Sequence, residues 1–181
     1  MKALLSTATG GPETLTLGEL PRPIAGKGQI VIDVKACAVN FPDVLIIEDK
    51  YQFKPERPFA PGGEVAGLVA EIGEGVTEFK VGDRVIAGCG NGGMSEAVAV
   101  GVHNVYHLPE GHGFAEGASL LMTYGTSIHA LVDRGHIKEG DTLLHRLASG
   151  LQGIGNIGEP GRGVGCLRLV HPPQAYREIA H

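Results

Sequence analysis

Cysteine and histidine are the side chains of this 181-residue chain best suited to bind a metal or to act as a nucleophile. The chain has three cysteines, Cys37, Cys89 and Cys166. An odd number at such wide spacing is neither a disulfide framework nor a metal knuckle, so we expect reduced thiols packed as small hydrophobic residues. Five histidines show no ligand spacing and no triad, and we expect ordinary surface or core residues at His103, His107, His112, His129 and His136.

A glycine pattern near the C-terminal end formally matches GxGxxG at residues 153–158. A dinucleotide site needs a buried strand before such a turn and a helix after it, with the helix N-terminus at the pyrophosphate. A strand begins at residues 142–144, but polar residues from His145 interrupt it. Glu159-Pro160-Gly161 follows the glycines and cannot form the helix. We therefore predict that this pattern, common by chance in glycine-rich sequence, binds no nucleotide.

The first hundred residues have the pattern of a compact β structure. The whole chain contains 29 glycines and 11 prolines, and this content indicates many tight turns. Alternation of apolar and polar residues is clearest at 29–38, where Ile30, Ile32, Val34 and Ala36 share one face. The predicted strands cover residues 2–5, 15–20, 29–38, 64–72, 79–87, 94–100 and 105–108. Such spacing favours a small barrel or sandwich.

Helices are predicted at two places. Residues 44–47 follow Pro42 and Asp43, which suit the first turn of a short helix, although a strand is the alternative. Residues 115–132 are rich in alanine and leucine at helical spacing, and we predict two helical segments separated at Thr123-Tyr124-Gly125. A glycine within 64–72, Gly67, predicts a bulge or a close approach of two backbones.

Five segments, at residues 34–43, 51–55, 58–67, 81–85 and 123–131, resemble the medium-chain dehydrogenase/reductase superfamily, and within it the zinc-independent quinone reductases. They follow the family's order and spacing within residues 1–144. The resemblance implies a mainly β (α+β) fold. It comprises a GroES-like, partly open β-barrel at residues 1–113, and connecting helices with the first strand of an incomplete Rossmann domain at 114–144. A divergent tail at 145–181 is predicted to be disordered.

The resemblance also bears on zinc. A catalytic zinc needs three protein ligands. In the family's zinc-dependent alcohol dehydrogenases a cysteine stands where this chain has Asn40, and a histidine where it has Gly63. Glu64 alone is retained, and one carboxylate does not hold zinc. The stretch 87–95 offers only Cys89, so the cysteine-rich structural zinc lobe is missing too. We predict no bound metal.

Three residues are candidates for the site. By resemblance, Asn40, Tyr51 and Thr126 face the nicotinamide and the substrate, with Asn40 and Tyr51 catalytic as well as cofactor-binding. Hydrogen bonds from such neutral groups would stabilise the enolate or quinol oxygen as hydride arrives. The residues alone leave ordinary roles open: Asn40 as a helix cap, Tyr51 as a loop aromatic and Thr126 bonded back into its helix.

The implied activity is NADPH-dependent reduction of quinones, enones and other activated alkenes. Because no intact cofactor domain follows, we expect this chain to be inactive alone and to bind no NADPH. Alternatives are a non-catalytic partner of a full-length paralogue, docking through an exposed helix face, and an inert pseudogene product. The aperiodic tail suggests translation in a shifted frame from about codon 145. A natural short member with a divergent tail is the rival explanation.

Composition excludes other classes. Hydrophobic residues make up 43% and charged residues 19%, with a net charge of -5, which argues against disorder and against nucleic-acid binding. No apolar run suits a signal core or a membrane span, which predicts a cytoplasmic protein. The expected partner is a small quinone or enone. Apolar surface left by the missing domain predicts a homodimer or aggregation.

Overall fold

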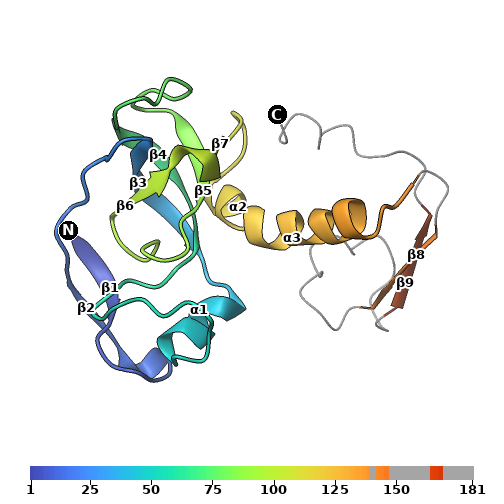
Figure 1. The fold of residues 1–181 in the computed structure, drawn as a ribbon, viewed down its shortest axis with the longest axis horizontal. Coiled ribbons are helices and arrows are strands. Elements are labelled where there is room, and N and C mark those ends of the chain that lie inside the picture. Colours follow the sequence, from blue (N-terminus) through green and yellow to red (C-terminus); the bar gives the residue numbers. More distant parts are fainter. Residues whose placement is uncertain (139–141, 147–163, 169–181) are drawn as a thin grey trace. The chain divides into compact units, whose positions relative to one another are not determined.

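The computed structural model describes residues 1–138, 142–146 and 164–168 (Figure 1). The chain divides into two compact units, Met1–Leu121 and Met122–His181, and each is described by itself.

A five-stranded antiparallel sheet in the order β6-β3-β4-β5-β7 forms the centre of the first unit (Figure 1). The strands are β3 (Gln29–Ala38), β4 (Glu64–Ile72), β5 (Arg84–Gly88), β6 (Ala97–Gly101) and β7 (Val105–His107), with a short 3-10 turn η2 (Val102–Asn104) before the last. Ile30, Ile32, Val65 and Val85 are fully buried in the core on one face of this sheet. Burial of these β-branched side chains is the main source of stability in such a sheet.

An irregularity in β3 reverses its alternation. Val34 pairs with Gly67 and Ala36 with Ala66, so β3 has one residue more than β4 at this point. Val34 therefore packs in the main core, whereas Ala36 packs on the opposite face, against a second cluster. The prediction that these two residues share a face was wrong, because a bulge shifts the period by one residue.

Gly67 lies where β4 passes close to the backbone of β3. A Cβ atom at this position would be 2.1 Å from the carbonyl oxygen of Asp33. No side chain fits at that distance, so glycine is required here for steric reasons. The predicted close approach of backbones at Gly67 is confirmed.

A two-stranded hairpin lies beside the sheet. It consists of β1 (Lys2–Ser6) and β2 (Leu15–Glu19), joined through a short turn, η1 (Pro12–Thr14). Two isolated bridges connect β1 to the loops before sheet strands. Ala3 pairs with Ser95, just before β6, and Ser6 pairs with Phe59, before β4. The first unit is thus mainly β, as the sequence predicts.

Two short helices complete this unit. The helix α1 (Phe41–Ile47) follows β3, with Pro42 and Asp43 in its first turn, and this confirms the predicted helix over the alternative strand. The helix α2 (Phe114–Ala118) buries Ala118 on the second face of the sheet.

The helical segment that leads into the second unit is continuous where a break was predicted. It comprises a π-helical turn η3 (Leu121–Gly125), α3 (Thr126–Ile128) and a second π-helical turn η4 (His129–Arg134). Gly125 adopts helical angles, with φ −58° and ψ −47°, so the glycine does not interrupt the segment. The interruption lies before Leu121, where α2 ends.

Two further strands belong to the second unit. The strand expected from residue 142 is present as β8 (Thr142–Arg146), and it continues through the polar residues that were predicted to interrupt it. It pairs antiparallel with β9 (Val164–Arg168), which lies in the stretch predicted to be an aperiodic tail. The rest of that tail lies outside the described residues.

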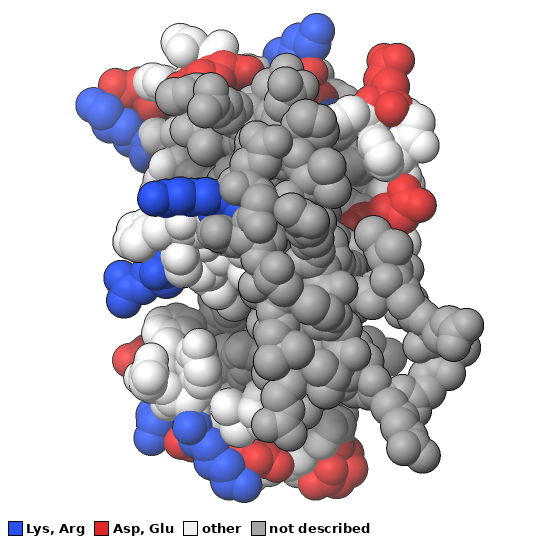
Figure 2. Space-filling view, turned by 90° about the vertical axis from the view of Figure 1, so that its right-hand side faces the viewer, with Lys and Arg blue, Asp and Glu red and all other residues white. Residues whose placement is uncertain are grey.

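The surface of the described part carries charges of both signs. In Figure 2, both acidic and basic side chains occur at the rim of the visible face. Among the residues that the structure describes, no helix is long and apolar enough to cross a membrane.

Candidate functional site

Asn40 occupies the junction between β3 and α1. Its backbone is extended, with φ −116° and ψ 158°, as expected for an N-cap residue. The backbone N–H of Asn40 donates to Oδ2 of Asp43 at 2.7 Å, and the N–H of Asp43 donates to the carbonyl oxygen of Asn40 at 3.0 Å. Asp43 therefore fixes the first turn of the helix and, with it, the position of Asn40.

The side chain of Asn40 contacts a buried carboxylate. Its Nδ2 donates to Oε2 of Glu64 at 3.3 Å. Glu64 is the first residue of β4 and is only 1% exposed, and its Oε1 accepts the backbone N–H of Leu121. Asn40 itself is half-buried. One carboxylate thus connects the candidate amide to the residue at which the helical segment begins.

A second buried carboxylate holds the same region from the other side. Asp43 is 5% exposed, and its Oδ1 accepts the backbone N–H of Gly62 at 3.2 Å. Gly62 has φ +98°, and a Cβ atom there would lie 2.6 Å from Sγ of Cys37. The glycine elbow before β4 is therefore packed directly against the start of α1.

The cysteines near this elbow are protonated thiols. Burial raises the pKa of Cys37 to about 11, with further contributions from the negative charges of Asp43 and Glu64. Burial also raises the pKa of Cys89 to about 12, and its Sγ donates to the carbonyl oxygen of Gly62 at 3.3 Å. Both are free cysteines, which agrees with the expected packed, reduced thiols.

Tyr51 lies in the loop between α1 and β4. Its half-buried ring packs against Ile46, Ile47 and Phe59. The candidate role of its hydroxyl stays a prediction.

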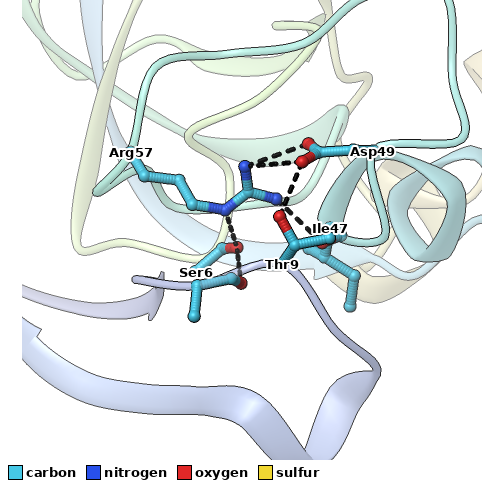
Figure 3. A network of polar contacts seen from close by, with 6 residues as sticks. Ser6, Thr9, Ile47, Asp49 and Arg57 are labelled. Atoms are coloured by element: carbon cyan, nitrogen blue, oxygen red, sulfur yellow. Dashed lines mark hydrogen bonds and ion pairs between the residues drawn. The ribbon is translucent and has the colours of Figure 1, made fainter.

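Arg57 closes the loop that carries Tyr51 (Figure 3). Its Nη1 lies 2.9 Å from Oδ1 of Asp49, and its Nη2 donates to the carbonyl oxygen of Ile47 at 2.9 Å. Its Nε donates to Oγ of Ser6, a fully buried residue of β1, at 3.2 Å. The ends of the loop are thereby tied to each other and to the hairpin.

Asp49 has one more partner in this group. Oγ1 of Thr9 donates to its Oδ2 at 2.6 Å. This hydrogen bond first, and the contact with Arg57 second, lower the pKa of Asp49 below its ordinary value. We call Ser6, Thr9, Ile47, Asp49 and Arg57 the Arg57 network.

Several apolar side chains close in sequence to the two candidates are exposed. Val39 and Phe41, which flank Asn40, are each 73% exposed, and Phe53 is 51% exposed. A neutral amide whose sequence neighbours are exposed and apolar suits a flat, largely apolar ring with few polar atoms. Nicotinamide and quinones are rings of this kind.

Thr126 belongs to the second unit. It is the first residue of α3 and is exposed, and the neighbouring Ser127 is the residue whose hydroxyl bonds back into the helix, to the carbonyl oxygen of Thr123 at 2.8 Å. A shared site with Asn40 and Tyr51 stays a prediction.

Metal binding finds no support in the described part of the chain, where no three His, Cys, Asp or Glu side chains are grouped to hold an ion. Asn40 and Glu64 are bonded to each other, and Gly63 has no side chain. Some of the described histidines contact protein groups instead, as in the 2.7 Å pair of His129 with Asp133. Absence of zinc stays a prediction.

Sequence reasoning missed the roles of Asp43 and Glu64. The spacing of Asn40 and Asp43 is that of a capping box, which was a usable signal. Glu64 opens an apolar strand, and a carboxylate in such a strand needs hydrogen-bond partners. Those partners are 24 and 57 residues away in sequence, so the pattern alone does not identify them.

Comparison with known proteins places this geometry in a family. Residues 26–110 match the alcohol dehydrogenase GroES-like domain. Human quinone oxidoreductase is 37% identical over 156 residues, which is 85% of this chain and 47% of that protein. A probable oxidoreductase from Mycobacterium abscessus has a TM-score of 0.73 and 40% identity over 78% of this chain and 45% of its own. Quinone oxidoreductase of Escherichia coli, solved with NADPH, has a TM-score of 0.69 and 27% identity, covering 78% and 43%.

The match is partial in length, because the chain spans less than half of the curated relatives that it matches. Within that span the GroES-like domain, the mainly β fold and the relatives agree. The chain is therefore a quinone oxidoreductase-like member of the medium-chain dehydrogenase/reductase superfamily.

Proposed function

We propose that this chain carries the substrate-side part of an NADPH-dependent reductase of quinones, enones and other activated alkenes. The observation that carries the proposal is the half-buried Asn40 amide, held by Glu64 and flanked by exposed apolar side chains on a GroES-like domain. The relatives named quinone oxidoreductase support the substrate class, and a neighbour solved with NADPH supports the cofactor.

The chemistry is a two-electron reduction. When bound, NADPH supplies a hydride, and a proton from water completes the hydroquinone or the saturated ketone. Asn40 and Tyr51 would hydrogen-bond the polar atoms of the two rings, and Thr126 would add a third contact. Neutral groups suffice, because they only need to orient the rings and stabilise charge that develops on oxygen.

We also propose that the 181-residue chain needs a nucleotide-binding domain that residues 145–181 do not supply. This part rests on the sequence, in which Glu159-Pro160-Gly161 follows the glycine pattern. Titration of the chain with NADPH, followed by nicotinamide fluorescence, tests it directly. Micromolar binding would contradict this part and leave the substrate-side proposal standing.

The substrate-side proposal is tested in a chimera. Residues 1–138 of this chain replace the matching part of the Escherichia coli quinone oxidoreductase, and NADPH oxidation is measured with a quinone. We expect quinone-dependent turnover, reduced about tenfold or more by Asn40→Ala, since a ligand hydrogen bond is lost.

Tyr51→Phe should lower the rate of quinone reduction in the same chimera, whereas Tyr106→Phe, at a half-buried tyrosine of β7, should not. A folded chimera that binds NADPH but reduces no quinone or enone would refute the proposal.

A non-catalytic role is the second candidate, and the exposed Val39, Phe41 and Phe53 favour it. It predicts that the chain associates with increasing concentration, and that Phe41→Ser reduces this association in sedimentation velocity. A monomer at all concentrations, together with an active chimera, would remove this candidate.

A further inference from the structure

We infer that Glu64 is a positioning residue that holds the Asn40 amide in one orientation, with Oδ1 presented to a ligand as a hydrogen-bond acceptor. The ligand part of this inference rests on the proposed function. The orientation itself depends only on contacts within the chain and can be measured without a ligand.

The orientation follows from the chemistry of the two side chains. A carboxylate offers only acceptors, whereas an amide has a donor end and an acceptor end of nearly equal size. Nδ2 of Asn40 donates to Oε2 of Glu64 at 3.3 Å. The reversed amide would bring two unprotonated oxygens together beside a carboxylate that is 1% exposed, which is unfavourable. Oδ1 is therefore the end of the amide that points away from Glu64.

Glu64 is itself fixed. Its second oxygen, Oε1, accepts the backbone N–H of Leu121. A backbone N–H can only donate, so this contact always requires an oxygen. The oxygen that faces Asn40 is an acceptor as well, so it selects the donor end of the Asn40 amide.

The charge behind the amide determines what Asn40 recognises. A carboxylate at Nδ2 makes the amide a poorer donor to a developing anion and a better acceptor for a neutral N–H or O–H group. The proposed reaction contains two such donors: the carboxamide N–H groups of the nicotinamide in NADPH, and the O–H groups of the hydroquinone product. Stabilisation of the developing oxyanion is thus left to other groups, of which Tyr51 is the candidate.

A single isosteric substitution should invert the arrangement. In Glu64→Gln the one remaining oxygen goes to Leu121, and the new NH2 group faces Asn40. The Asn40 amide must then turn its Oδ1 inward and its NH2 outward. Glu71→Gln is the matched control, since Glu71 is also on β4 and its Oε1 accepts the backbone N–H of Ala25 at 3.1 Å.

Nitrogen-15 NMR of the full chain measures the orientation. The Asn40 side-chain NH2 signals are assigned by their loss in Asn40→Asp, and their hydrogen exchange is compared with that of Asn104, an exposed residue. We expect exchange at Asn40 to be about tenfold slower or more, and Glu64→Gln to remove this protection while Glu71→Gln keeps it. Equal exchange of Asn40 and Asn104 in the native chain overturns the inference even if Glu64→Gln does not fold.

The double variant Asn40→Asp, Glu64→Gln separates orientation from simple disruption. The introduced aspartate presents oxygen at both ends, the introduced glutamine can donate to one of them, and the pair keeps its net charge. In the active chimera we expect Glu64→Gln to lower kcat/KM about tenfold or more, and the double variant to recover to within about threefold of the unmodified chimera. Undiminished kcat/KM in Glu64→Gln, or no recovery in the double variant, overturns the inference.

Two readouts assign the ligand group. If the nicotinamide carboxamide of NADPH is the donor to Asn40, Glu64→Gln raises the Kd for NADPH. If the hydroquinone is the donor, the Kd is unchanged and product inhibition by hydroquinone weakens. An inactive chimera with a protected Asn40 amide would count against the proposed function and support the orientation.

Discussion

Two buried carboxylates determine the electrostatics around Asn40. Asp43 and Glu64 each accept backbone N–H groups, and both raise the pKa of Cys37. These hydrogen bonds offset part of the cost of burying the two charges. The neighbourhood of Asn40 is therefore negative on its protein side, which disfavours thiolate formation close to the site.

The thiols give a pH prediction. In the unfolded chain they ionise near their ordinary pKa of 9.0, whereas Cys37 and Cys89 keep their protons until about pH 11 and 12 when folded. The unfolded state therefore loses protons first, and stability should fall as pH rises from about 9 through 11. Cys37→Ala and Cys89→Ala should each remove about one proton from that slope, measured by urea denaturation across this range. Parallel slopes in the variants and the wild type would show that these thiols do not titrate differently on folding.

At the scale of elements, the sequence predicted β3 and α1 well. Alternation gave the bounds of β3, and Pro42 with Asp43 marked the start of α1. Gly67 indicated an irregularity at this point, but the extra residue in β3 was not predictable, because one inserted residue leaves the strand looking regular on either side. The continuous helix at Gly125 was missed for another reason, namely that neighbouring turns can hold glycine at helical angles despite its low propensity.

The candidate site was predictable only in part. The resemblance supplied Asn40 and Tyr51, and the structure shows where each lies within the first unit. The sequence did not indicate the contact between Asn40 and Glu64, nor the Arg57 network, because both join segments that are distant in sequence. Long-range polar contacts of this kind have no periodic signature.

The Arg57 network gives a prediction at this scale. Arg57→Ala should lower the free energy of unfolding by about 1–3 kcal/mol, because the buried Ser6 hydroxyl and Ile47 carbonyl lose a donor. Arg22→Ala is the control, since Arg22 pairs with Asp33 at 50% and 41% side-chain exposure, and its effect should stay within about 0.5 kcal/mol. Chemical denaturation measures both, and equal losses would contradict a special role for Arg57.

The same network has an acid dependence. The pKa of Asp49 is lowered from 3.8 by its folded-state contacts. The contribution of Asp49 to the free energy of unfolding is therefore present above pH 3.8 and is lost as pH falls below that value. The difference in stability between wild type and Arg57→Ala should narrow over the same range.

At the scale of the whole molecule, hydrophobic clusters stabilise the described fold, and two of them lie on opposite faces of the five-stranded sheet. We expect EDTA to leave the thermal unfolding midpoint unchanged, because the described residues offer no group of three metal ligands. Metal analysis of the purified chain, before and after EDTA, provides the second measurement. A midpoint that falls with EDTA and returns with zinc would show that a metal contributes to folding.

The closed loop between Asp49 and Arg57 also determines where a protease can cut. Trypsin cleaves after lysine and arginine but not before proline, and Lys54 and Arg57 precede Pro55 and Pro58. Lys50 is thus the one susceptible position in this loop, and its side chain is 66% exposed. Cleavage needs several residues in an extended conformation, which a loop fastened at both ends cannot supply. The rate of nicking after Lys50 therefore reports how often this loop opens in the otherwise folded chain.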